Sequence, residues 1–249
     1  MNNILNFGRL GLLLRKDIVT GYRLAGLTLL TAFVIATLAI LINDEYDFHY
    51  EFFPVVILLG GFIYASVTFN ELHTKDQRHV FLSLPASAFE KLLSKLLLST
   101  LGFALVMTLS YWLYTLVINA VADGWLGIEL QDFTPFEKEM WLAIKLFLVL
   151  QSVFLLGSVY FDNYAFMKTV GTLLVVALVL ALITYLLANV FLAKHFEGWS
   201  FRPRNVVPSE ALRSFMEGPF TKVIKFIFWY LLAPFLWVVA YFKLKEREA

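Results

Sequence analysis

Six long apolar runs recur along the chain, separated by short charged segments. Each run has about 18 to 25 residues, enough for a helix to cross the roughly 30 Å hydrocarbon core of a bilayer with some tilt. The runs cover residues 24–42, 52–69, 96–118, 141–161, 169–193 and 223–242. The pattern predicts an all-α integral membrane protein with six transmembrane helices, forming a single transmembrane domain over residues 1–249.

The segment before the first run, residues 3–20, has a different pattern. Its apolar side chains are interrupted by Arg9, Arg15, Lys16 and Asp17, so it is too charged to span a bilayer. An amphipathic helix with basic residues lies in the membrane interface, where lipid phosphates meet its charges. We therefore expect an N-terminal interfacial helix over residues 3–20.

Composition supports a membrane protein and excludes several other classes. Apolar residues make up 60% of the chain and charged residues 16%, whereas an ordinary soluble domain is about half apolar and about a quarter charged. The net charge of +1 argues against nucleic acid as a partner, because phosphate binding needs a clustered basic surface. The absence of cysteine excludes disulfides and thiolate metal sites.

The distribution of lysine and arginine predicts the orientation of the spans. Loops on the side of the N-terminus carry twelve of these residues, and loops on the other side carry six. Because cytoplasmic loops are enriched in lysine and arginine, both termini are predicted to lie in the cytoplasm.

The segment 194–222, which precedes the last run, reads as a separate structural feature. Ser209 can cap a short helix, and Pro219 would end it, because the residue before a proline is disfavoured in a helix. The apolar side chains of Leu212, Phe215 and Met216 suggest that this helix dips into the membrane or packs on the bundle. We expect an external or re-entrant helical segment before the last span.

The motifs of common enzymes and metal sites are missing from the sequence. A phosphate-binding loop needs a Gly-Lys pair, which occurs nowhere, so any ATP must bind a partner. The four histidines lack the spacing of a zinc peptidase, and there is no Gly-x-Ser-x-Gly motif. We therefore predict no catalytic residues, no metal and no cofactor.

Two ionisable residues lie at or inside predicted spans. Lys145 is about one turn inside the fourth span, and Glu71 is at the inner end of the second. Ionisable groups in a bilayer are costly and are often functional, but a lysine near a span end can extend its charge to the interface. Both residues are interpreted as interfacial, with a role in a transport pathway as the alternative.

The loop between the second and third spans contains two helix starts. Thr74 with Gln77 and Ser87 with Glu90 have the spacing of capping boxes, and Pro85 separates them. The pattern predicts a short surface helix, a break, and then a helix that continues into the third span. The short helix would present its apolar residues to the cytosol, or would instead lie on the membrane surface. The outward-facing residues would be His79, Val80, Phe81 and Leu82.

Motifs in this loop resemble those of a known transporter family. The run Leu84-Pro85-Ala86-Ser87 is followed by Glu90-Lys91 and Ser94-Lys95, and together they resemble the permease subunits of ABC-2 type ATP-binding-cassette exporters. The charged C-terminal tail Tyr241–Glu248 and the N-terminal interfacial helix are also similar to that family.

The resemblance implies a dimer of six-span subunits in a bacterial cytoplasmic (inner) membrane, paired with separate ATPase subunits. It implies that residues 75–83 form a coupling helix docked in the ATPase, with Arg78 as a rim contact. The residues assigned to coupling are Arg78, Val80, Phe81 and Leu82, together with Pro85, Ser87 and Glu90, which fix where the helix ends.

The expected function is therefore that of a permease subunit of an ATP-driven exporter, with a second copy or a paralogous subunit completing the pathway. A secondary transporter or channel is one alternative, although mid-span carboxylates, which such a protein would use, are lacking. A non-transporting membrane scaffold is another. The resemblance implies no substrate, because the family moves drugs, peptides, polysaccharides and lipids.

Overall fold

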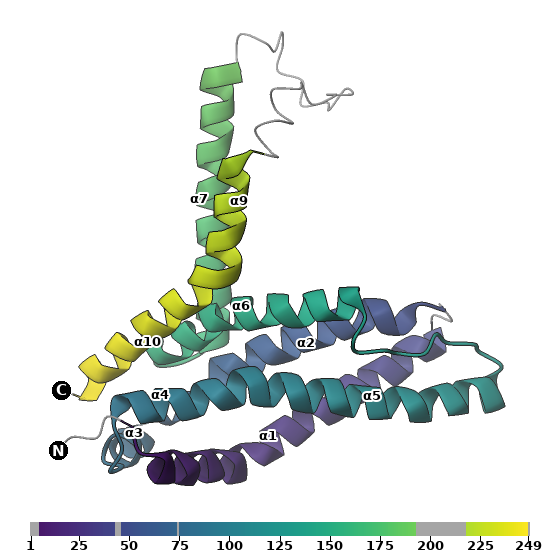
Figure 1. The fold of residues 1–249 in the computed structure, drawn as a ribbon, viewed down its shortest axis with the longest axis horizontal. Coiled ribbons are helices and arrows are strands. Elements are labelled where there is room, and N and C mark those ends of the chain that lie inside the picture. The colour runs from purple at the N-terminus through teal and green to yellow at the C-terminus, as the bar shows by residue number, and fades with distance from the viewer. Residues whose placement is uncertain (1–4, 43–45, 74, 193–217, 249) are drawn as a thin grey trace. The chain divides into compact units, whose positions relative to one another are not determined.

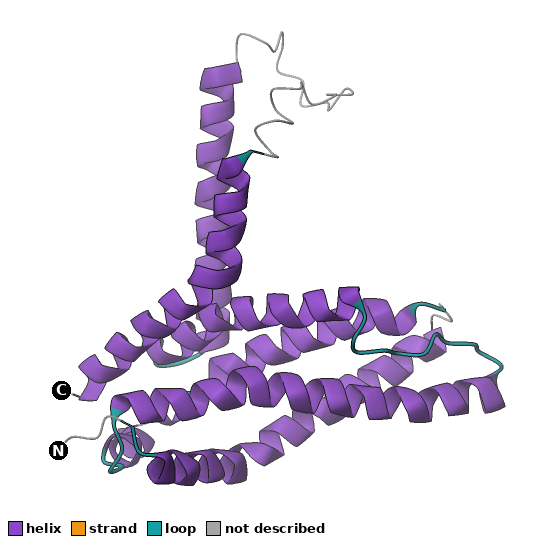
Figure 2. Cartoon of the chain, in the orientation of Figure 1, coloured by secondary structure: helices purple, strands orange, loops and turns teal. Residues whose placement is uncertain are grey.

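The computed structural model describes residues 5–42, 46–73, 75–192 and 218–248. They belong to two units, Met1–Phe166 with Ala233–Ala249, and Met167–Leu232. The described residues are helical or lie in short connections, and no strand occurs among them (Figure 2). The prediction of an all-α fold is confirmed for these residues.

Six of the described helices are long and apolar enough to cross a membrane, as the sequence predicted. They indicate a multi-pass membrane protein. The apolar stretches are Ala25–Ile42, Phe48–Leu72, Ala88–Trp125, Lys138–Tyr160, Ala165–Leu186 and Thr221–Glu248.

The first unit, called the bundle unit below, contains most of the helices (Figure 1). Its third span is a nearly unbroken helix in which two π-helical turns, η2 and η3, interrupt the α-helical geometry. The elements are α1 (Phe7–Ile42), α2 (Phe48–Val67), η1 (Asn70–Leu72), α3 (Lys75–Leu82), α4 (Ala88–Leu97), η2 (Leu98–Gly102), α5 (Phe103–Val121), η3 (Ala122–Leu126) and α6 (Lys138–Tyr160), with α10 (Leu232–Glu248) joining from Ala233.

Helix α1 differs from the prediction because it is continuous over 36 residues. The predicted interfacial helix 3–20 and the span 24–42 are one element, although α1 bends along its length (Figure 1). The change in charge pattern near Arg23 marks where the apolar stretch begins, at Ala25, but no residue there breaks the helix.

The core of the bundle unit forms where α2 and α6 pack along one another. Phe62 of α2 stacks on Phe154 of α6 with ring centroids 4.4 Å apart. Gly61 provides the room for the ring of Phe147, since a Cβ atom at Gly61 would lie only 2.1 Å from Phe147 Cε2. The main cluster of buried apolar side chains comes from α2, α5, α6 and the loop 127–137: Phe53, Val56, Ile57, Phe103, Ala104, Met107, Tyr111, Phe133, Met140, Ala143 and Phe147.

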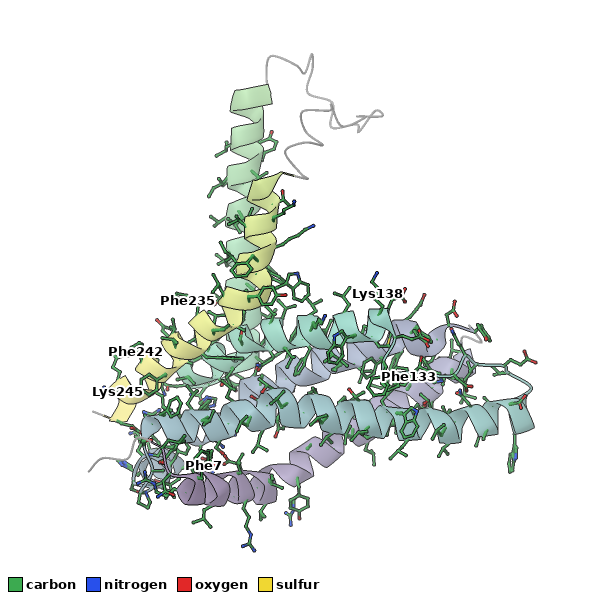
Figure 3. All side chains as sticks on the ribbon, viewed as in Figure 1. Phe7, Phe133, Lys138, Phe235, Phe242 and Lys245 are labelled. Carbon is green, nitrogen blue, oxygen red and sulfur yellow. The ribbon has the colours of Figure 1, made fainter. Side chains whose placement is uncertain are left out.

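The bundle unit has two distinct ends. One, called the α3 end, brings together α3, the first turn of α1 and the last turn of α10, and includes Phe7 and Lys245 (Figure 3). The opposite end carries the loop 127–137, with Phe133 and Lys138 (Figure 3). The first described residues of α1 and the last of α10 both lie at the α3 end (Figure 1).

The second unit contains most of α7 (Ala165–Leu192), followed by α9 (Pro219–Phe226) and the π-helical turn η4 (Ile227–Leu231). The described α7 side chains from Met167 to Leu186 are mostly apolar and exposed. The hydroxyls of Thr172 and Thr184 donate to the carbonyls of Lys168 and Leu180 in their own helix, as a lipid-facing helix requires.

The predicted external or re-entrant helix falls largely outside the described residues, which omit 193–217. Within its range, Pro219 occupies the first turn of α9, where a missing amide hydrogen costs nothing.

Candidate functional site: the α3 end and its polar cavity

The connection between α3 and α4 forms as the capping pattern predicted. Ser87 is the N-cap of α4: its Oγ accepts a hydrogen bond from the backbone N–H of Glu90 at 3.2 Å, and Glu90 Oε2 accepts one from the N–H of Ser87 at 2.9 Å. Helix α3 ends at Leu82 and α4 begins at Ala88, with Pro85 in the turn between them. The other proposed cap residue, Thr74, lies outside the described residues.

Phe81 does not face outward, so the prediction that it is an exposed anchor is wrong. Its side chain is only 3% exposed and lies edge-on to Phe69, with ring centroids 6.2 Å apart. Three ammonium groups surround the ring, since the Nζ atoms of Lys16, Lys91 and Lys95 lie 5.4, 5.4 and 5.9 Å from its centroid. Helix α3 packs on the bundle through Phe81, because cations near an aromatic face are attracted to it.

The other residues assigned to coupling divide between the two faces of α3. Val80 is 66% exposed and points away from the bundle, while Leu82 is half-buried. Arg78 is engaged with its own chain: its Nε donates to the carbonyl of Leu72 at 2.7 Å, and its Nη2 donates to Asp162 Oδ1 at 3.1 Å. Of the predicted apolar anchors, Val80 is the one available to a partner.

Glu90 has a second role besides capping. Its Oε1 accepts hydrogen bonds from the backbone N–H of Asn6 at 2.6 Å and from Arg9 Nη2 at 2.9 Å, while its side chain is fully buried. Because each carboxylate oxygen serves a different segment, Glu90 joins the start of α1 to the start of α4.

A second group of charges, called the ion-pair network below, links α1, η1 and α4. Lys95 Nζ lies 3.0 Å from Asp17 Oδ1, and Ser94 Oγ donates to Asp17 Oδ2 at 2.8 Å. Lys16 Nζ donates to both carboxylate oxygens of Glu71 at 2.8 Å, and Lys95 Nζ is 3.6 Å from Glu71 Oε1. The side chains of Asp17 and Lys95 are 6% and 9% exposed, so this pair is nearly removed from solvent.

Charged contacts hold the C-terminal turn of α10 at the α3 end. Lys91 Nζ donates to Glu248 Oε1 at 2.9 Å and to the carbonyl of Leu82 at 3.0 Å. Asp162 Oδ1 lies 2.8 Å from Arg247 Nη1 and also accepts from Arg78. Helix α3 is thus connected to α1, α4 and α10 by charged contacts.

A cavity of about 210 Å³, called the α3-end cavity, lies beside the ion-pair network. Residues of α1, α2, η1, α3, α4 and η2 line it, and most of the lining side chains are polar. Its members include Asp17, Tyr64, Asn70, Glu71, Gln77 and Lys95.

The two ionisable residues predicted at the spans differ in their surroundings. Glu71 belongs to the ion-pair network and lines the cavity. Lys145 is exposed on α6, away from the network, and its Nζ lies 5.6 Å from the ring centroid of Trp141. A snorkelling lysine next to an aromatic ring fits that position.

Sequence reasoning missed Asp17 and Lys95 as a pair. It also missed a fully buried histidine at the opposite end. His49 Nε2 is 2.8 Å from Asn119 Oδ1, and its Nδ1 is 3.2 Å from the hydroxyl of Tyr111. The signal for Asp17 was an acidic residue within an otherwise basic and apolar segment, but the sequence does not identify its partners.

No group of three or more His, Cys, Asp or Glu side chains suited to a metal ion occurs among the described residues. No protein-family model matches the chain, and no curated protein or solved structure matches it either. The fold indicates a multi-pass membrane protein, and its α3 end carries a charged network beside a polar cavity. With no matching relative, the function proposed for the chain follows from this geometry.

Proposed function

We propose that this chain is a permease subunit of an ABC-2 type ATP-driven exporter, working with a separate ATPase and with a second copy or a paralogous subunit. The observation that carries the proposal is α3, a short helix between the second and third spans. One of its faces is held by the bundle, and Val80 on the other is exposed.

The contacts of α3 would allow it to transmit a movement from an ATPase to the spanning helices. Phe81 lies against lysines of α1 and α4, and Arg78 is linked through Asp162 to Arg247 of α10. A push on α3 by an ATPase would therefore act on three spanning helices at once. Transport by alternating access needs rigid elements that shift together in this way.

The same proposal places the α3 end and both termini in the cytoplasm of a bacterium, following the excess of lysine and arginine in loops on that side. The first part of α1 would lie in the membrane interface, with the exposed Arg15 among lipid phosphates. The loop 127–137 would then face the outside.

A secondary transporter is the second candidate, favoured by the carboxylates that line the α3-end cavity. These carboxylates lie at the end of the spans, whereas coupling ions usually bind near the midplane of the membrane. Transport in the absence of any ATPase would decide for this alternative.

The docking role of α3 is tested by replacing Val80 with aspartate. An exposed apolar side chain that becomes buried against a partner contributes strongly to binding, and a charge there costs desolvation. We expect Val80→Asp to reduce co-purification of the chain with its partner ATP-binding-cassette ATPase at least tenfold, and to remove the stimulation of ATP hydrolysis that the parent chain gives in lipid.

The matched control is Phe136→Asp, which adds the same charge at an exposed apolar site in the loop 127–137. It should leave co-purification unchanged. Phe81→Asp is unsuitable, because burying a carboxylate would damage this chain itself. If Val80→Asp inserts normally and supports the same complex and hydrolysis as the parent, α3 does not dock the ATPase.

The orientation is tested by single cysteines, because the chain has none of its own. Glu129→Cys lies on the loop 127–137 and Ser83→Cys follows α3, and both positions are exposed. We expect an impermeant thiol reagent to label Glu129→Cys in intact cells and Ser83→Cys only after permeabilisation. The reverse pattern would invert the proposed topology.

A further inference from the structure

The α3-end cavity has polar groups that the chain itself does not use. Its volume of about 210 Å³ is far larger than the roughly 10–15 Å³ that one water requires. Within the described residues, the half-buried hydroxyl of Tyr64 and the exposed side-chain amides of Asn70 and Gln77 have no hydrogen-bond partner from the chain. These three groups come from α2, η1 and α3, and they surround a space into which a polar molecule fits.

The charged side chains that line the α3-end cavity favour one class of ligand. Asp17 and Glu71 contribute two carboxylates, against one ammonium from Lys95. Lys16 balances Glu71 from outside the lining, so once Lys16 moves away an anion would meet an excess of negative charge. A bare metal ion would find no set of three acidic or histidine ligands among the described residues. An organic cation with hydrogen-bond donors suits the lining better than either.

The two carboxylates differ in how firmly they are held. Asp17 is buried, paired with Lys95 and bonded to Ser94. Glu71 is 23% exposed, and its partner Lys16 is 33% exposed. Ion pairs open to solvent contribute little stability, and a long lysine side chain can move its charge into water. Exchanging Lys16 for another cation at Glu71 therefore costs less than exchanging Lys95 at Asp17.

We propose that the α3-end cavity binds a primary ammonium group, with Glu71 as its counter-ion and Lys16 as the cation it displaces. The three N–H donors of such a group match the Glu71 carboxylate, a side-chain carbonyl of Asn70 or Gln77, and the hydroxyl oxygen of Tyr64. A quaternary ammonium lacks these donors and binds more weakly. The ammonium belongs to a small soluble amine or to a phospholipid headgroup.

The test uses a single-cysteine variant, Thr20→Cys, in nanodiscs of phosphatidylcholine. Thr20 lines the cavity and is exposed, and its hydroxyl donates only to the backbone carbonyls of Lys16 and Asp17. Its labelling rate is measured with a neutral methanethiosulfonate, which reacts with thiols and not with amines. We expect millimolar ethanolamine to slow labelling at least threefold and choline to have less effect.

Nanodiscs containing phosphatidylethanolamine, without added amine, distinguish the two sources. Protection by free ethanolamine alone identifies a soluble amine as the ligand class, whereas protection by the lipid identifies a headgroup. Equal labelling under every condition would overturn the proposal.

Two further variants separate ligand binding from a purely structural network. In the Thr20→Cys background, Glu71→Gln should abolish protection, because the counter-ion is lost. Lys16→Met should lower the half-protecting ethanolamine concentration at least threefold, because the competing cation is removed. Lys243→Met serves as the control, since Lys243 is about as exposed as Lys16 but pairs with Glu246, outside the cavity. A structural network predicts no gain in affinity for Lys16→Met, so an unchanged concentration would also contradict the proposal.

Lys16→Met keeps the test decisive if Glu71→Gln fails to fold. The cavity lies within this chain, so the experiment needs no ATPase. Its failure would leave the proposed permease role untouched.

Discussion

Gly61→Ala is expected to disrupt the packing of α2 against α6. A Cβ atom at this position would lie 2.1 Å from Phe147 Cε2 and 2.6 Å from Cδ2, far inside van der Waals contact. Phe147 is fully buried in the main core cluster, so its ring cannot turn away into solvent. Overpacking of this kind typically costs about 1–3 kcal/mol.

The measurement is the thermal unfolding midpoint of the detergent-purified protein. About 2–4 °C per kcal/mol for a chain of this size gives an expected fall of roughly 2–12 °C. Gly60→Ala is the matched control, because its Cβ would lie 3.4 Å from Phe103 Cζ, an ordinary contact. Alanine is a better helix former than glycine, so the control should be neutral or slightly stabilising. Equal midpoints for the two variants would refute the tight α2–α6 contact.

The elements that the sequence predicted correctly are those determined by nearby residues. Apolar runs long enough to cross a bilayer identify spans without knowledge of their neighbours. The break at Pro85 and the Ser87–Glu90 cap involve groups within a few positions of each other, so their spacing alone is informative. The boundary expected between residues 20 and 24 is absent because a change in charge pattern does not end a helix.

The orientation of α3 could not be predicted in the same way. Which of Val80 and Phe81 faces outward depends on lysines of α1 and α4, one of which, Lys16, is 65 positions from Phe81. The sequence places apolar residues on a short helix, but the face that packs is chosen by tertiary contacts. The assignment of Phe81 as an exposed anchor failed for this reason.

The ion-pair network could not be predicted from the sequence for a related reason, since its members are far apart in the chain. Asp17 and Lys95 lie on α1 and α4, with all of α2, η1 and α3 between them in the chain. The two side chains become buried together only when α1 packs against α4, and the sequence alone does not predict that packing. Glu71 stands out in the sequence because it ends a span, but nothing in the sequence identifies Lys16 as its partner.

Removing one charge of the Asp17–Lys95 pair is expected to destabilise the bundle unit more than removing both. Lys95→Met removes the nearest ammonium from the buried Asp17 carboxylate and leaves it with the Ser94 hydroxyl and the more distant Lys16 Nζ, 3.5 Å from Oδ1. Breaking a buried ion pair in this way typically costs about 3–5 kcal/mol. Asp17→Leu leaves the Lys95 ammonium with only the more distant Glu71, 3.6 Å away.

The double variant Asp17→Leu/Lys95→Met removes both buried charges and restores electroneutrality. Replacing a buried pair by apolar side chains is often neutral or stabilising, so we expect the double variant to unfold at a higher temperature than either single variant. A double-mutant cycle on thermal midpoints measures this coupling. The exposed pair Lys243–Glu246, changed to methionine and leucine in a parallel cycle, should show little coupling. If the Asp17 and Lys95 effects simply add, the two groups do not stabilise each other, and the network does not hold α1 against α4.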